Sequence, residues 1–248
     1  MSPAISSTAG AQPADSLPSR DGVPWVSARE WRTAGMAAAT TAMLIPLDRP
    51  IALRVDRTLG ASSRVVDVAD QVSAVAQPAV LLSTVALLGI GRITHRPAIA
   101  DAGMHGTEAL VVASAVTGGA KRIVGRLRPY AVDDRRALTF DPFNGADHAR
   151  SFPSGHATFA FTFAAVVQEE LARHPLMANN RRARWLVTSL LYGTATAVSI
   201  ARLAERDHWG SDLAAGAGVG ILSARWTVRH RHARGTNRFE RWLTGVTP

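Results

Sequence analysis

Six uncharged, apolar runs constrain the fold of this chain more than any other feature. A helix that crosses the roughly 30 Å hydrocarbon layer of a membrane needs about 20 apolar residues. Only the second run, with 21 residues, meets that length cleanly, and the fifth, with 17, is borderline. Hydropathy alone therefore leaves both a membrane protein and a soluble helical protein open. The runs are residues 33–47, 71–91, 109–120, 157–168, 185–201 and 213–224.

The last four runs each have one end beside a residue suited to chemistry. The third ends at Lys121, the fourth begins after His156, the fifth ends before Arg202 and the sixth begins after Asp212. If the runs are antiparallel spans, these four ends lie on one face of the membrane. Charged residues in such helices normally face a wet cavity. The sequence thus predicts an all-α, multi-span membrane protein of about six transmembrane helices, in which a core helical bundle carries the site.

Arginines crowd the opposite ends of the same runs. Excess basic residues mark the cytoplasmic side of a membrane protein. We therefore expect cytoplasmic termini and a site on the outer, periplasmic or extracellular, face, although Arg54, Arg57 and Arg64 in the first outward loop go against the rule. The arginines that carry this prediction are Arg92, Arg96, Arg173, Arg181, Arg182, Arg184, Arg225, Arg229, Arg231 and Arg234.

The bulk composition narrows the partners. A formal net charge of +9 suits a nucleic acid, an anionic membrane surface or an anionic substrate. No nucleic-acid motif accompanies the basic segment 225–241, so we expect a membrane anchor and no nucleic-acid partner. The absence of cysteine excludes thiolate catalysis and cysteine zinc sites. Residues 1–28 have the composition of a disordered tail, 29–230 form the membrane-embedded domain, and 231–248 are predicted to be a basic cytoplasmic tail.

The only lysine of the chain, Lys121, stands seven residues before Arg128. Lysine presents a compact ammonium where arginine presents a planar fork, so this position is a candidate anion ligand. Two helical turns separate the residues, which would share a face if the helix continued to Pro129. A basic helix end that reaches toward the membrane surface explains the pair equally well.

A second fragment, Ser154-Gly155-His156, precedes the fourth apolar run. Serine is a good N-cap, and the free amides of a first helical turn bind anions. Glycine lets the backbone approach a ligand closely. An ordinary capped helix is the alternative interpretation of this fragment.

A third fragment contains Arg202, His208 and Asp212. The last two are four residues apart, so their side chains can meet on one helix face. A carboxylate in that position can hold an imidazole in one tautomer and stabilise its cationic form. A structural His–Asp pair would have the same spacing.

Together the three fragments resemble the signature of the type 2 phosphatidic acid phosphatase and vanadium haloperoxidase superfamily. That signature reads Lys-x6-Arg-Pro, then Pro-Ser-Gly-His, then Ser-Arg-x5-His-x3-Asp. The internal spacings match over residues 121–212, and Ala201 stands where the family usually has serine.

The resemblance implies a metal-independent phosphatase without a cofactor, acting on a lipid phosphate or diphosphate. It implies that His208 attacks phosphorus and forms a phosphohistidine, while Asp212 orients it. His156 would protonate the leaving alkoxide and then activate water. The phosphoryl ligands implied in the same way are Lys121, Arg128, Ser154, Gly155 and Arg202.

Four other functions remain to be weighed. A metal held by His156, His208 and Asp212 is disfavoured because three fixed cations would repel it. A Ser154/His208/Asp212 hydrolase triad lacks the Gly-x-Ser-x-Gly elbow. A haloperoxidase would usually be a larger, soluble chain. A non-catalytic protein that binds or transports phosphorylated lipid would need the cations but not two histidines.

Two further expectations concern the rest of the chain. Residues 130–152, with Phe140 and Phe143, could form a lid or an interfacial loop on the outer face. The remaining histidines fit no motif and are expected in loops and tails: His95, His105, His148, His174, His230 and His232.

Overall fold

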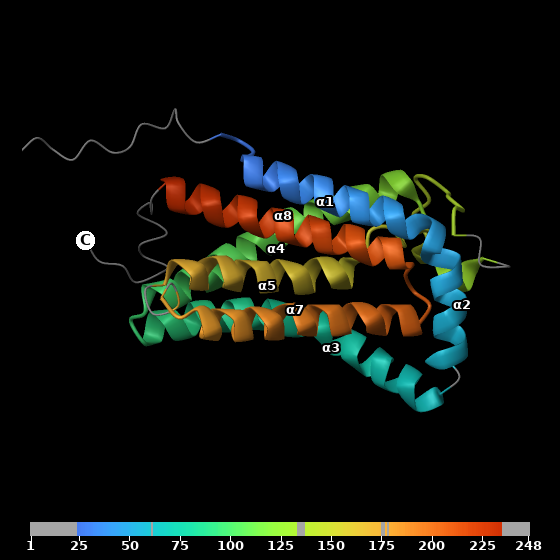
Figure 1. Ribbon diagram of the computed structural model, residues 1–248, viewed down its shortest axis with the longest axis horizontal. Helices are drawn as coiled ribbons and strands as arrows, with labels where there is room; N and C mark the ends of the chain where they lie inside the picture. Colours follow the sequence, from blue (N-terminus) through green and yellow to red (C-terminus); the bar gives the residue numbers. More distant parts are fainter. Residues whose placement is uncertain (1–23, 61, 133–136, 175–176, 178, 235–248) are drawn as a thin grey trace, which may run out of the picture.

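The computed structural model describes residues 24–60, 62–132, 137–174, 177 and 179–234, and most of these are helical. Six long helices pack side by side, and the short helix α2 (Asp48–Thr58) lies across one end of the bundle (Figure 1). Each apolar run lies in one long helix, the first continuing into η2 (Ile45–Leu47). The predicted all-α fold is confirmed. The long helices are α1 (Ala28–Leu44), α3 (Ser63–Ile93), α4 (Pro97–Val124), α5 (Gly155–Arg173), α7 (Arg181–Ala204) and α8 (Gly210–Arg234).

The outer surface of the bundle is apolar. Large hydrophobic side chains on α1, α3 and α7 are exposed where a water-soluble protein would carry polar ones. By length and hydropathy α3 and α7 could each cross a membrane, and these are the helices of the two longest apolar runs. Exposed examples are Met36, Met43, Leu82, Val85, Leu186 and Leu190.

Helix α4 ends earlier than the sequence suggests. Its C-cap, Gly125, has a left-handed conformation with φ of 57°. A Cβ atom there would lie 2.0 Å from the carbonyl oxygen of Asp141, so only glycine fits. The helix therefore stops before Pro129, so the condition under which Lys121 and Arg128 would share one helix face is not met.

Small residues on α8 allow close packing on two sides. A Cβ atom at Gly216 would lie 2.5 Å from the carbonyl oxygen of Ser154, and one at Gly220 the same distance from that of Thr158. Gly218 instead faces α1, where its Cβ would lie 2.5 Å from the Cβ of Ala37. Such residues let helix backbones approach, and here they position the start of α5 against α8.

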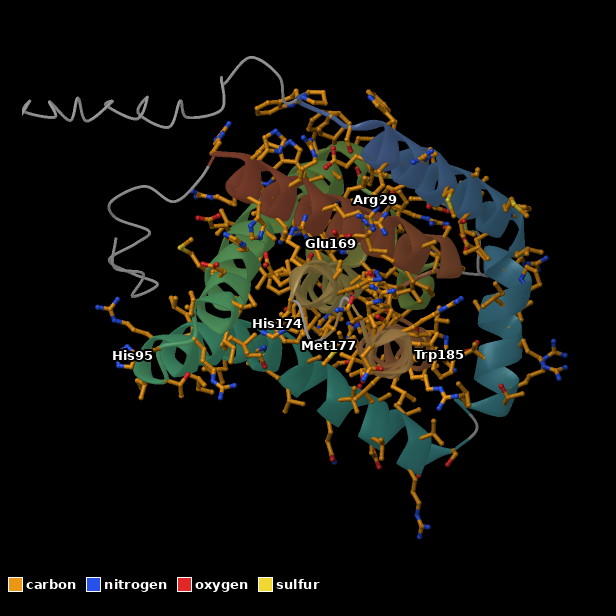
Figure 2. The ribbon with its side chains drawn as sticks, turned by 60° about the vertical axis from the view of Figure 1, so that its left-hand side comes forward. Arg29, His95, Glu169, His174, Met177 and Trp185 are labelled. Carbon is orange, nitrogen blue, oxygen red and sulfur yellow. The ribbon has the colours of Figure 1, made fainter. Side chains whose placement is uncertain are left out.

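The end of the bundle opposite α2 is held by ion pairs. Arg229 of α8 pairs with Glu30 of α1 at 2.8 Å, and Arg29 pairs with Glu169 of α5 at 2.9 Å (Figure 2). The carbonyl of Trp25 accepts a hydrogen bond from Arg229, so the segment just before α1 contacts α8. Most of both predicted tails, residues 1–23 and 235–248, lies outside the described residues.

Three histidines differ from the expectation that they lie in loops and tails. His105 is buried in α4, and both His230 and His232 belong to α8. The reason is that α4 begins, and α8 ends, about ten residues beyond the apolar run that each contains, at Pro97 and Arg234. Polar residues in these extensions pack against neighbouring helices.

Candidate active site

The three sequence fragments meet at one end of the bundle, the end crossed by α2 in Figure 1. Lys121 lies in the last turn of α4, and its ammonium donates to the carbonyl oxygen of Arg150. The backbone amide of Ser154, the N-cap of α5, donates to the carbonyl oxygen of Asp212 at 3.0 Å. Arg202 lies in the last turn of α7. Four helix ends thus converge.

The Asp212 carboxylate is held mainly by groups other than the histidine. Its Oδ2 accepts from the Ser151 hydroxyl at 2.5 Å and from the Trp209 amide at 2.8 Å. The Nδ1 atom of His208 lies 3.7 Å from the same oxygen, beyond hydrogen-bond length. The expected His–Asp neighbours are adjacent, but the imidazole is not hydrogen-bonded to the carboxylate.

His208 sits in the short connection between α7 and α8 and is only 3% exposed. Burial lowers its pKa to about 3, and the nearby cations Lys121 and Arg128 act in the same direction against the opposing pull of Asp212. The imidazole is therefore neutral at pH 7 and keeps a free lone pair.

A buried arginine that sequence analysis did not single out orders the site. Arg126 is 2% exposed, and its Nη1 donates to Asp212 Oδ1 and to the Ser211 hydroxyl, each at 2.7 Å. Its Nη2 donates to Asp48 Oδ2, also at 2.7 Å. Asp48 in turn accepts from the Ser211 amide at 2.8 Å. One guanidinium thus joins α2 to the start of α8.

The only sequence signal for Arg126 is its place two residues before Arg128. In an extended segment, residues two apart point to the same side. Here, however, Arg126 is buried whereas Arg128 faces the site. Its main partner, Asp48, is 78 residues away in the chain. No local pattern connects the two.

Arg128 and Arg202 already share a bound anion. The Asp207 carboxylate lies between them: its Oδ2 is 2.8 Å from Arg128 Nη1 and also bonds Arg202 Nη2. Arg202 additionally pairs with Glu205, and Arg128 with the exposed Asp147 at 2.9 Å. The two arginines expected to hold phosphoryl oxygens therefore form an anion-binding seat that a carboxylate fills.

A cavity of about 330 Å³ opens beside this seat. Its wall includes His156, Arg202 and Asp207, and the α3 residues Asp70 and Ser73 face them. The Nε2 atom of His156 lies 3.1 Å from the carbonyl oxygen of Ser73, which can only accept, so Nε2 carries a proton.

The remaining predicted residues are placed as follows. Ser154 is fully buried and caps α5 by accepting from the Ala157 amide at 3.5 Å. Gly155 begins α5, where backbone amides lack intrahelical partners. His208 is not among the residues that line the 330 Å³ cavity beside His156. It lines a second, smaller cavity instead. Around these side chains, the described residues contain no cluster of three potential metal ligands.

The segment that links α4 to α5 exposes two aromatic side chains. Phe140 and Phe143 are 47% and 77% exposed. The role of residues 130–152 as a lid or interfacial loop stays a prediction.

A family model, described as the PAP2 superfamily, matches residues 103–236, over half of the 248-residue chain. This range contains all three sequence fragments. The chain belongs to the PAP2 superfamily. A search of curated protein sequences finds no match.

Two solved structures share the fold. A transmembrane PAP2-type phosphatidylglycerolphosphate phosphatase from Bacillus subtilis superimposes with a TM-score of 0.61 at 18% identity, covering 84% of this chain and 98% of its own. LpxE from Aquifex aeolicus superimposes with a TM-score of 0.52 at 18% identity, covering 74% of this chain and 95% of its own. This PAP2 protein therefore has an all-helical membrane fold.

Proposed function

We propose that this PAP2 protein is a metal-independent phosphatase that hydrolyses a lipid phosphate or diphosphate monoester through a phosphohistidine. The observation that carries the proposal is the anion seat between Arg128 and Arg202, next to a buried neutral imidazole, His208. Family membership and the phosphatidylglycerolphosphate phosphatase among its structural relatives support the same conclusion.

Binding begins with exchange of anions. The phosphoryl group takes the place of the Asp207 carboxylate on Arg128 and Arg202, and Lys121 supplies a third cation. Charge-assisted hydrogen bonds of this kind contribute roughly 1.5–3 kcal/mol each. The Ser154 hydroxyl and the Gly155 amide add donors at the start of α5.

The first chemical step forms the phosphohistidine. Nδ1 of His208 faces Asp212, so Nε2 is the nucleophile. Its lone pair attacks phosphorus while the bond from phosphorus to the leaving oxygen breaks. His156, which the bound phosphoryl anion favours in its cationic form, gives the proton on Nδ1 to the departing alkoxide and keeps the Nε2 proton on the Ser73 carbonyl. Asp212 balances the positive charge that develops on the nucleophilic ring.

The second step releases phosphate. Neutral His156 removes a proton from water, the oxygen attacks phosphorus, and the nitrogen–phosphorus bond breaks with its electron pair returning to His208. In both steps negative charge is spread over the phosphoryl oxygens, where the three cations stabilise it.

The helix surfaces support a membrane setting for this activity. The protein is a multi-pass integral membrane protein with the site on the outer face and both termini in the cytoplasm. Apolar surfaces on α1, α3 and α7 support insertion, and the arginine-rich end opposite the site supports the orientation. A site at a bundle end, near the membrane surface, suits a lipid substrate and needs no nucleic-acid partner.

The test is phosphate release from a panel of lipid phosphates in detergent with excess EDTA. We expect activity in the wild type, none in His208→Ala, and unchanged activity in His174→Ala, a histidine at the far end of the bundle (Figure 2). Radiolabelled substrate should leave an alkali-stable, acid-labile label on the wild type and none on His208→Ala.

Three outcomes would overturn the proposal. Loss of activity in EDTA without a fall in melting temperature would point to a catalytic metal. Full activity of folded His208→Ala would remove the phosphohistidine. Saturable binding of lipid phosphates without release of phosphate would favour the alternative, a protein that binds or transports phosphorylated lipid.

A further inference from the structure

A second polar cluster lies at the other end of the bundle, near the ion pair of Arg29 and Glu169 labelled in Figure 2. It joins three helices: His105 of α4, Glu170 of α5 and His232 of α8. Glu170 Oε1 lies 2.7 Å from His105 Nδ1 and 3.1 Å from His232 Nε2. His105 and Glu170 are buried, at 4% and 8% exposed.

The donor set is that of a transition-metal site. One ligand atom from each of the three residues lies within 4.8 Å of the others. A tetrahedral zinc ion with ligands at about 2.0–2.1 Å separates its ligand atoms by roughly 3.3 Å, so only small side-chain shifts are needed. Two neutral imidazoles and one carboxylate suit Zn²⁺ and similar ions, whereas Mg²⁺ prefers oxygen ligands.

Access and charge also favour a cation here. His232 is exposed, so an ion can enter beside it and keep one coordination position for water. The adjacent Arg231 is bound by Glu108, with Nε 2.6 Å from Oε2, which offsets its positive charge. This differs from the phosphoryl site, where three cations disfavour a metal.

We propose that His105, Glu170 and His232 bind a divalent transition-metal ion, with Zn²⁺ as the best fit. The ion would cross-link α4, α5 and α8 at the end remote from the phosphoryl site. Those are the helices that carry Lys121 and Asp212 and the imidazole of His156, so the ion would brace the scaffold without touching the substrate.

The experiment measures metal binding and stability rather than phosphatase activity, so its result is independent of the proposed function. The purified full-length chain in detergent is stripped with EDTA, desalted and titrated with Zn²⁺ against a chromophoric chelator, with Mg²⁺ in parallel. We expect one Zn²⁺ per chain, no saturable Mg²⁺ binding, and a higher melting temperature with Zn²⁺.

Two variants and one control locate the ion. Glu170→Gln keeps the side-chain shape but loses the anionic ligand, and His232→Ala removes the exposed imidazole. Each should raise the Kd for Zn²⁺ by at least about tenfold and abolish the Zn²⁺-dependent shift in melting temperature. His174→Ala, at the same end of the bundle, should behave as the wild type.

The proposal is overturned if the wild type binds Zn²⁺ no more tightly than folded Glu170→Gln does. It is also overturned if Zn²⁺ leaves the melting temperature of the wild type unchanged. The cluster would then be a hydrogen-bonded triad only. If His232→Ala does not fold, the nearly isosteric Glu170→Gln decides the question alone.

Discussion

At the scale of single residues, the site depends on which anion each cation holds. Asp207 is bonded to both Arg128 and Arg202, while Arg126 is committed to Asp212 and Asp48. Arg128, which is partly buried, and Arg126, which is fully buried, therefore have different roles although they lie two residues apart. In the proposed mechanism Arg128 exchanges Asp207 for substrate, whereas Arg126 holds the Asp212 carboxylate beside His208.

Replacing Asp207 with asparagine should strengthen anion binding. The substitution removes the negative charge that competes with phosphate for two arginines, so the inhibition constant of inorganic phosphate should fall about tenfold. Inhibition of phosphate release from a lipid substrate by added phosphate or vanadate measures this. Asp147→Asn, which removes an exposed partner of Arg128, should change the constant little. Weaker inhibition of Asp207→Asn would mean that Asp207 instead positions the arginines.

Replacing Arg126 with lysine should damage both stability and turnover. A lysine ammonium cannot bond Asp48, Ser211 and Asp212 together, and breaking a buried ion pair typically costs about 3–5 kcal/mol. Melting in detergent and steady-state kinetics of the folded protein check the two effects. We expect kcat to fall while KM changes little, because Arg126 is bonded to protein groups only.

The matched control is Arg122→Lys, an exposed arginine in the last turn of α4. It should keep both melting temperature and kcat. A normal kcat in folded Arg126→Lys would reduce Arg126 to a purely structural role.

At the scale of elements, the α5–α8 contact sets the geometry of the site. The start of α5 lies against the first turns of α8 through Gly216, close enough for the Ser154 amide to reach the Asp212 carbonyl. Side chains larger than glycine at the contact would separate these two helix ends, and with them Ser154 from Asp212.

A single methyl group at this contact should be costly. In Gly220→Ala the new Cβ would lie 2.5 Å from the Thr158 carbonyl oxygen, and such overpacking typically costs about 1–3 kcal/mol. Gly193→Ala on α7 meets no atom within 4 Å and should be neutral or slightly stabilising. Melting temperatures in detergent compare the pair, and equal values would show that α8 can shift without penalty.

At the scale of the whole molecule, the two ends of the bundle are chemically different. One end carries the anion seat and α2; the other carries arginine-rich helix ends joined to Glu30, Glu108 and Glu169. Several of the arginines counted toward the positive-inside prediction, among them Arg173, Arg225, Arg229 and Arg231, are thus also ion-pair partners. The number of arginines at this end therefore overstates the unpaired positive charge that could orient the protein in the membrane.

Orientation can be tested because the chain has no cysteine. Phe143→Cys places a thiol on the site end and Arg182→Cys places one on the opposite end, both at exposed positions. A membrane-impermeant maleimide should label the first in intact cells and the second only after permeabilisation. The reverse pattern would put the site on the cytoplasmic face.

The all-α fold, the six long helices and the placement of the three fragments at one end of the bundle could all be predicted from the amino-acid sequence. Apolar runs and fixed spacings along a helix are local properties, so they can be read without coordinates. Three features of the site became known only from the folded chain: α4 ends at Gly125, Arg126 binds Asp48 and Asp212, and Asp207 fills the anion seat. The folded chain also placed His105, Glu170 and His232 together. Each of these depends on contacts between residues distant in the chain, whose energies no local pattern encodes.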